Sequence, residues 1–112
     1  MRSYDDSCGI ARALDTVGDR WTLLIVRELL GGTRRFSELR RALVRISPKT
    51  LTARLRDLEE QGVLTRTVYA QVPPRVDYTL TPRGEALGEI IAAMARWGSA
   101  EELGAGADAG PS

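Results

Sequence analysis

Residues 35–62 read RFSELRRALVRISPKTLTARLRDLEEQG and contain two helix signals with a short break between them. The second signal is the clearest in the chain. Ser47 is a favoured N-cap residue, and Pro48 stands at the first helical position, where proline costs no hydrogen bond. This helix is expected to end at Gly62. A shorter helix with Ser37 as its N-cap precedes it, and residues 44–46 form the break.

The second predicted helix has two faces, because successive residues turn by about 100°. Its apolar face carries three leucines suited to a core: Leu51, Leu55 and Leu58. Its opposite face carries residues that are free to contact another molecule: Lys49, Thr50, Ala53 and Arg56. A solvated face is the alternative explanation, since amphipathic helices usually expose their charged residues.

Helix signals also precede this segment. Apolar residues recur at helical spacing from Cys8 to Leu14, and the pattern stops near Gly18. The segment WTLLIVRELL, residues 21–30, is apolar almost all round, as expected of a helix at the centre of a small domain. Two glycines end it.

After Gly62 the pattern changes from helical to β-rich. VLTRTVY (63–69) and VDYTL (76–80) are separated by AQVPPR, whose two prolines cannot occupy a central strand. A hairpin with a stiff tip is therefore predicted. Thr81 and Pro82 repeat the capping signature and open one long final helix.

This order of elements is typical of a winged helix-turn-helix module with an extra terminal helix. The expected fold is mainly α with a small β-hairpin, and the terminal helices are expected to mediate dimerisation. We expect a flexible N-terminus at residues 1–7, this domain at residues 8–103 and a disordered tail at residues 104–112. In such modules the second motif helix enters the DNA major groove, and the wing lies along the neighbouring backbone or minor groove.

The charge distribution points the same way. The whole chain has a net charge of only +1, from 16 Lys and Arg against 15 Asp and Glu. From Arg20 to Arg56, however, ten residues are basic and two are acidic, so this stretch carries 10 − 2 = +8. Such a concentration of positive charge favours a surface that neutralises phosphates.

Composition limits the other classes of function. The 112 residues suffice for one domain, and they include no histidine and one cysteine, Cys8. A zinc site or a catalytic histidine is thereby excluded within one chain, and we expect no enzyme, no cofactor and no metal. No apolar run approaches the roughly 18 residues of a membrane span, and the first residues lack a signal-peptide pattern. We expect no membrane partner and a cytoplasmic location.

Three stretches of the chain resemble the HxlR-type regulators, a branch of the MarR-like winged-helix transcription factors. They are GDRWTLLIVRELLGGTRRFSELRRAL, ISPKTLTARLRDLEEQGVLTRTVY and VPPRVDYTLTPRGEAL. The similarity runs from about Cys8 to Trp97, and the Trp-Thr pair, RFSEL, the double-proline wing and YTLT are specific in combination. The resemblance implies a homodimeric DNA-binding regulator that often acts on a nearby promoter.

The outward residues of the second motif helix are predicted to read bases. We expect Lys49 and Arg56 to contact guanine edges or phosphate, Thr50 a base or phosphate, and Ala53 a thymine methyl group. Phosphate or wing contacts are predicted for six further residues: Arg35, Arg40, Arg41, Ser47, Arg54 and Arg75. Two alternatives stay open, since the stem of Arg54 could simply cover the core and Arg75 could be an ordinary loop cation.

The final helix carries a long apolar stripe: Leu87, Ile90, Ile91, Met94 and Trp97. Its own domain could bury this stripe. A helix of this length projects past a small module, however, and we predict a dimer interface there, with help from the first helix. Two-fold symmetry would then place two recognition helices about 34–36 Å apart on a pseudo-palindromic operator.

Cys8 is open to two interpretations. Free cysteines are commonly buried and inert. The start of a helix, however, carries partial positive charge that favours a thiolate, and Arg12 follows one turn on. Several HxlR-type regulators use a similarly placed cysteine to sense electrophiles or oxidants, which makes Cys8 a redox-sensing candidate. A proline often follows that cysteine, whereas Gly9 follows it here.

The predicted function is sequence-specific regulation of transcription by a homodimer on double-stranded DNA. A response to electrophiles or oxidants through Cys8 is an additional hypothesis, and the identity of any small-molecule effector stays open. The alternative is a winged-helix module that binds protein and not DNA. The basic stretch separates the two, because a protein-binding derivative would have little use for eight net positive charges.

Overall fold

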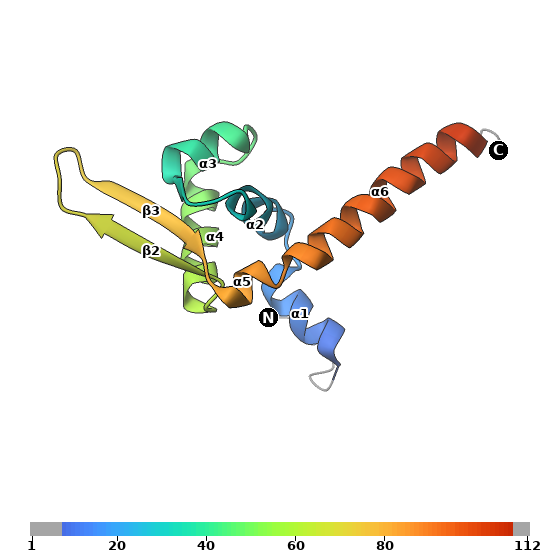
Figure 1. The fold of residues 1–112 in the computed structure, drawn as a ribbon, viewed down its shortest axis with the longest axis horizontal. Helices are drawn as coiled ribbons and strands as arrows, with labels where there is room; N and C mark the ends of the chain where they lie inside the picture. Colours follow the sequence, from blue (N-terminus) through green and yellow to red (C-terminus); the bar gives the residue numbers. More distant parts are fainter. Residues whose placement is uncertain (1–7, 109–112) are drawn as a thin grey trace.

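The computed structural model describes residues 8–108, and the predicted flexible segment 1–7 lies outside them. Figure 1 shows a small domain from which the β2–β3 hairpin extends on one side and α6 on the other. The elements in chain order are α1 (Gly9–Val17), α2 (Thr22–Leu30), β1 (Arg34–Arg35), α3 (Phe36–Ala42), α4 (Pro48–Glu60), β2 (Leu64–Tyr69), β3 (Arg75–Leu80), α5 (Pro82–Glu85) and α6 (Gly88–Asp108).

The predicted fold class is confirmed, with one addition. The hairpin of β2 and β3 is joined by β1, giving an antiparallel sheet in the order β1-β3-β2. Arg34 pairs with Tyr78 and Arg35 with Asp77 across the added strand. β1 was not predicted. A strand of two residues has no periodicity of its own and is defined by its distant partner.

The core forms where α2, α3 and α4 meet the sheet. Ile25 and Val26 of α2 are fully buried, as is Leu39 of α3. The three leucines of the predicted apolar face of α4 are also buried, which confirms that prediction: Leu51, Leu55 and Leu58. This burial fixes which face of α4 remains exposed.

The two motif helices begin differently. Ser47 caps α4 as predicted, since its Oγ accepts a hydrogen bond of 3.0 Å from the amide of Thr50. The predicted cap at Ser37 is wrong. The N-cap of α3 is Arg35, two residues before Ser37, so the helix begins at Phe36, and the Glu38 carboxylate accepts a 2.8 Å bond from the Arg35 amide. Pairing of Arg35 in β1 sets this earlier start.

The single long final helix of the sequence analysis is instead two helices, α5 and α6. Thr81 caps α5 as predicted, with its Oγ1 3.1 Å from the amide of Gly84. Gly84 is buried against the start of β2, where a Cβ atom would overlap the carbonyl oxygen of Val63. Gly84 and Gly88 flank the break and are weak helix formers.

α6 continues to Asp108, beyond residue 103, where the sequence analysis ends the domain. Propagating an existing helix fixes one residue for each added hydrogen bond, and α6 continues in this way through Gly104 and Gly106, although glycine is a weak helix former. Residues 109–112 of the predicted tail lie outside the described residues. Neither α6 nor any other helix of residues 8–108 has the length and apolar character needed to cross a membrane.

Candidate nucleic-acid interface

α3 and α4 form a helix-turn-helix pair held from below by buried side chains. Leu43 and Ile46 in the connecting turn are 4% exposed, so the turn is anchored in the core. Val44 and Arg45, between them, point outward and are exposed. The turn therefore fixes the angle between the helices while leaving its outer edge open to a partner.

Ion pairs and hydrogen bonds divide the basic side chains into two groups. Several arginines have partners inside the domain: Arg27, Arg34, Arg54, Arg75 and Arg83. Arg20 lies over the ring of Trp21, and Arg35 interacts electrostatically with Asp77. Among the described side chains, seven further exposed cations have no ion pair, hydrogen bond, ring contact or electrostatic partner: Arg40, Arg41, Arg45, Lys49, Arg56, Arg66 and Arg96. All but Arg96 lie on α3, the turn after it, α4 or β2. The unpaired positive charge is thus concentrated on the helix-turn-helix half and the neighbouring strand.

The four residues predicted to read bases are not equally accessible. Lys49 and Arg56 are exposed on α4, whereas Thr50 and Ala53 are half-buried. The Thr50 hydroxyl also accepts a 2.9 Å bond from Ser47 Oγ. Thr52 is exposed on the same helix and was not selected from the sequence. Its position three residues after Lys49 and four before Arg56 could have identified it.

Arg54 is turned toward the rest of the domain. Its Nη2 lies 2.8 Å from Asp57, and its Nη1 lies 3.8 Å from Asp19 in the turn between α1 and α2. Its buried Nε has no hydrogen bond among the described residues. These contacts favour a role in holding α4 in place over the phosphate contact predicted for this side chain.

Asp19, at the other end of that ion pair, binds the backbone at the start of α2. Its Oδ1 accepts hydrogen bonds from the amides of Trp21, at 2.8 Å, and Thr22, at 3.0 Å. Burial alone would raise the pKa of the Asp19 carboxyl. The hydrogen bonds from Thr22 and Trp21, with the charge of Arg54, outweigh burial and lower this pKa below its ordinary value. Asp19 therefore stays charged and links α2 to α4.

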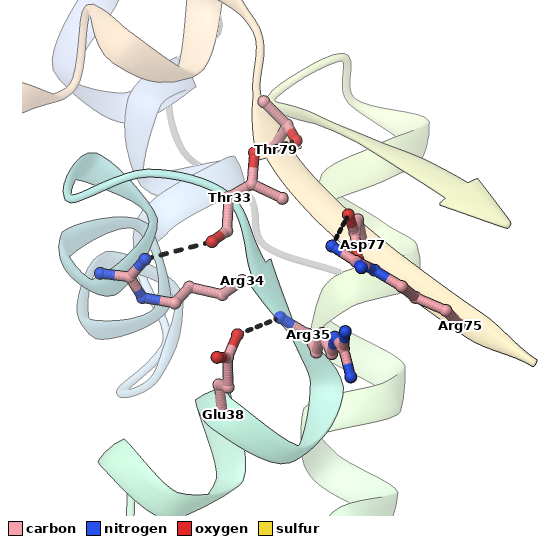
Figure 2. A network of polar contacts seen from close by, with 7 residues as sticks. All are labelled: Thr33, Arg34, Arg35, Glu38, Arg75, Asp77 and Thr79. Carbon is pink, nitrogen blue, oxygen red and sulfur yellow. Dashed lines mark hydrogen bonds and ion pairs between the residues drawn. The ribbon is translucent and has the colours of Figure 1, made fainter. Parts of the chain in front are cut away.

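A second group of polar contacts lies where β1 and the start of α3 meet β3 of the wing (Figure 2). Arg75 is the first residue of β3, at the base of the hairpin tip, and it donates two hydrogen bonds to the buried Asp77. These bonds lower the pKa of Asp77 below its ordinary value, and the charge of Arg35 adds to the effect. Arg75 Nη1 has no hydrogen bond among the described residues, so one edge of this guanidinium remains available.

The tip of the wing carries no charge. Residues 70–74 read AQVPP, and Val72 is 98% exposed. The guanidinium of Arg75 lies 5.5 Å from the ring centroid of Tyr69, which starts the tip on the other strand. Positive charge on the wing is thus confined to the two strands, and the tip itself offers only apolar and amide groups.

The apolar stripe of the final helix divides into two parts. Leu87 and Ile91 pack against the core of their own domain. Ile90, Met94 and Trp97 are exposed at 44%, 55% and 70%. An open groove of about 440 Å³ is lined by residues of α1 on one side and by Arg83, Leu87 and Ile90 on the other. The exposed part of the stripe continues outward from this groove.

Cys8 is the N-cap residue of α1 and is half-buried, so it lies just before the first helical turn. Its thiol is free, and its carbonyl oxygen accepts the amide of Arg12 at 3.0 Å. Cys8 thus lies at the start of the helix, as predicted.

These features define a class of protein. A short helix, an anchored turn, an amphipathic second helix with unpaired cations and a β-hairpin constitute a winged helix-turn-helix domain of the kind found in transcriptional regulators. A family model described as HxlR-like helix-turn-helix matches residues 16–103. The chain belongs to this family, which confirms the resemblance described above, and it is a transcriptional regulator of the helix-turn-helix type.

Relatives and solved structures agree with this assignment. The chain is 45% identical over 92 residues to the HTH-type transcriptional regulator sll1512 of Synechocystis, which covers 82% of this chain and 68% of the relative. A MarR-family regulator from Porphyromonas gingivalis has a TM-score of 0.82 at 35% identity, covering 88% of this chain and 97% of the other. The reduced form of the redox regulator HypR has a TM-score of 0.81 at 37% identity, covering 85% and 94%. Quinone-bound YodB from Bacillus subtilis has a TM-score of 0.70 at 33% identity, covering 80% and 94%.

Proposed function

We propose that this regulator binds a specific DNA operator as a homodimer. The observation that carries the proposal is the clustering of unpaired, exposed cations on α3, the turn and α4: Arg40, Arg41, Arg45, Lys49 and Arg56. A cation without an internal partner can exchange its counterion for a phosphate without breaking an ion pair. A surface that binds only protein would not require this concentration of one charge.

In this proposal α4 lies in the major groove. Lys49 and Arg56 contact guanine edges or phosphate. Thr50 contacts a base or phosphate, and Ala53 contacts a thymine methyl group. Ser47, at the start of the helix, lies nearest the DNA backbone. Arg35, Arg40 and Arg41 hold phosphates beside the groove. Arg75 contacts the backbone through the edge that Asp77 leaves open, and Arg54 positions α4 without touching DNA.

Dimerisation in this proposal uses the exposed part of the α6 stripe. Large apolar side chains that remain outside the core are Ile90, Met94 and Trp97, with Ile10 of α1 exposed at 74% on the neighbouring helix. Burial of such a stripe against its symmetry mate would remove apolar surface from water. Leu87 and Ile91, which already pack on the core, would form the inner margin of the interface. The two copies of α4 would then lie about 34–36 Å apart.

A response to oxidants or electrophiles is the second part of the proposal. It is supported by the free, half-buried thiol of Cys8 and by the similarity to HypR and YodB, which were solved in oxidised, diamide-treated or quinone-bound forms. If Cys8 is the sensor, Cys8→Ser should abolish the change in DNA affinity that diamide or a quinone causes. An unchanged response in that variant would remove Cys8 from the mechanism.

The DNA-binding proposal is tested by a mobility-shift assay on the region upstream of the chain's own gene and of its neighbour. Binding should weaken steeply between about 50 and 200 mM salt. Lys49→Gln and Arg56→Gln should lower affinity for the operator more than affinity for a scrambled duplex. The matched control is Arg27→Gln, because Arg27 is exposed but paired with Glu28. Failure to bind any duplex at low salt would contradict the proposal and favour a protein-binding module.

A further inference from the structure

A hollow of about 260 Å³ separates the exposed face of α4 from the wing. It is lined by six residues: Thr52, Leu55, Arg56, Glu59, Arg66 and Tyr78. Four of these come from α4, and the other two come from β2 and β3. The hollow lies directly beside the residues of α4 to which the proposed function gives base contacts. Of the two cations in this set, Arg56 and Arg66, only Arg66 has no DNA contact in the proposed function.

Strand register places Arg66 on the side of the sheet that faces α4. Residues paired across an antiparallel ladder point to the same face, and alternate residues share that face. Arg66 pairs with Tyr78, and Leu64 pairs with Leu80. Tyr78, Leu64 and Leu80 are buried in the core. Arg66 therefore continues a core-facing row outward, and its side chain emerges next to Arg56.

On the opposite face of the same sheet the cation is paired with a carboxylate. Arg75 lies there with Asp77, which occupies two of its donor groups. Arg66 is exposed and has no ion pair or hydrogen bond among the described residues, and the same is true of Arg56. Glu59 is the single carboxylate that lines the hollow. Two guanidinium groups against one carboxylate leave the hollow with a net positive charge.

We propose that Arg66 binds a DNA phosphate at the edge of the groove that α4 occupies, next to the base contacted by Arg56. This inference rests on the proposed function and adds a contact from β2 to it. A guanidinium group can donate two parallel hydrogen bonds to a phosphate. Because Arg66 contacts only the backbone, it fixes the position of α4 on the duplex and carries no sequence information.

The proposal has a quantitative signature in salt dependence. Each neutralised phosphate contributes about 0.9 to the slope of log affinity against log salt concentration. Loss of one such contact should therefore reduce the slope by about one. Between about 50 and 200 mM salt, the ratio of wild-type to variant affinity should fall by roughly 3.5-fold, which is a fourfold salt change raised to the power 0.9.

The test compares Arg66→Gln with two other single substitutions on the full chain. The matched control is Arg96→Gln, since Arg96 is also exposed and without a partner among the described residues but lies on α6. Arg66→Lys keeps the charge and should restore most of the salt slope. Fluorescence anisotropy is measured with the upstream duplex and with a scrambled duplex of the same length, across a range of salt concentrations.

We expect Arg66→Gln to weaken binding to both duplexes by the same factor and to lower the salt slope by about one. Arg96→Gln should leave the slope unchanged. A loss confined to the upstream duplex would overturn the proposal, because it would make Arg66 a base-reading residue. An unchanged slope would also overturn it. If the wild-type chain bound neither duplex at low salt, the proposed function itself would fail, which is a separate result.

Glu59→Gln distinguishes phosphate binding from an internal ion pair. If Arg66 serves DNA, removing the carboxylate takes away a repulsive charge and should modestly strengthen binding to both duplexes. Thermal unfolding should then be the same for Arg66→Gln and wild type. If Arg66 instead pairs with Glu59 in solution, each variant should lower the unfolding temperature and Arg66→Gln should leave the salt slope unaltered, which would overturn the proposal.

Discussion

Arg75 and Asp77 lie two residues apart on β3 and form an ion pair through two hydrogen bonds. Arg75 Nε lies 2.9 Å from Asp77 Oδ1, and Nη2 lies 3.1 Å from Oδ2. Asp77 is also the cross-strand partner of Arg35 on β1 and of Thr67 on β2. Asp77 thus lies on the central strand of the sheet, and its buried carboxylate fixes the guanidinium that lies over Tyr69.

Replacement of this carboxylate should loosen the wing. Asp77→Asn keeps the shape of the side chain but removes the charge that fixes Arg75. We expect amide hydrogens along β2 and β3 to exchange faster in the variant, while those of α2 keep their protection. Hydrogen exchange followed by mass spectrometry measures this difference. Equal protection of the hairpin in both proteins would show that Asp77 does not organise the wing.

Stability should decline in acid through Asp19 and Asp77. Both have pKa values below the ordinary 3.8, so the stabilisation they provide is complete above that value. It is lost as pH falls through their lower folded-state values. Urea unfolding at a series of pH values from 7 down to about 2 measures the decline. Asp19→Asn retains an acceptor for the α2 amides but no charge, so its stability should depend less on pH than that of wild type.

The two serines near the motif helices should differ in their contribution to stability. Ser47→Ala removes the oxygen that accepts the Thr50 amide and should lower the free energy of unfolding by about 1 kcal/mol. Ser37→Ala should change it little, because Ser37 lies inside α3, is exposed and has no hydrogen bond among the described side chains. Equal losses in chemical denaturation would contradict the observed start of α3.

Two glycines of the C-terminal helices should respond in opposite directions to alanine. Gly84→Ala forces a Cβ atom into the carbonyl of Val63 and should destabilise the domain by about 1–3 kcal/mol. Gly98→Ala adds a Cβ atom where no other atom lies within 4 Å. It should therefore stabilise α6, by about 0.5–1 kcal/mol. Thermal unfolding of both variants tests the pair, and a stabilising Gly84→Ala would refute the close approach.

The proposed dimer should depend on the exposed part of the α6 stripe. Met94→Glu together with Trp97→Glu places charge on side chains that are 55% and 70% exposed, so the monomer should still fold. Sedimentation should then give the mass of one protomer for the variant and of two protomers for wild type. Val44→Glu is the control for general surface charge, because Val44 is 84% exposed in the turn before α4. A wild-type monomer would contradict the dimer directly.

Local signals in the sequence were sufficient for the elements that depend on local chemistry. Ser47 and Pro48 predicted the start of α4, and Gly62, with a φ of 74°, lies just beyond its end as predicted. The helical spacing of Leu51, Leu55 and Leu58 predicted which face of α4 is buried. Caps and periodicity act within a few residues, so they can be recognised without knowledge of the partner.

Features that depend on distant partners could not be predicted in this way. β1 exists because Arg34 and Arg35 pair with β3, more than forty positions later in the sequence. The break between α5 and α6 reflects the packing of Gly84 on Val63. Arg54 and Arg66 have the same side chain, and only the fold distinguishes them. Arg54 lies between the carboxylates of Asp19 and Asp57, whereas Arg66 lies beside α4 without an ion pair among the described residues.

The contact of Gly84 with Val63 also fixes the position of α5, from which α6 extends. At about 1.5 Å per residue, this 21-residue helix is roughly 32 Å long. A small rotation of the helix at α5 would therefore produce a large displacement at its far end. A tilt of only about 5° at α5 would carry the far end some 3 Å sideways. In the proposed dimer, that displacement would change the distance between the two copies of α4. A substitution at position 84 would thus alter the spacing of the two DNA-binding helices in the proposed dimer, although glycine itself contacts no DNA.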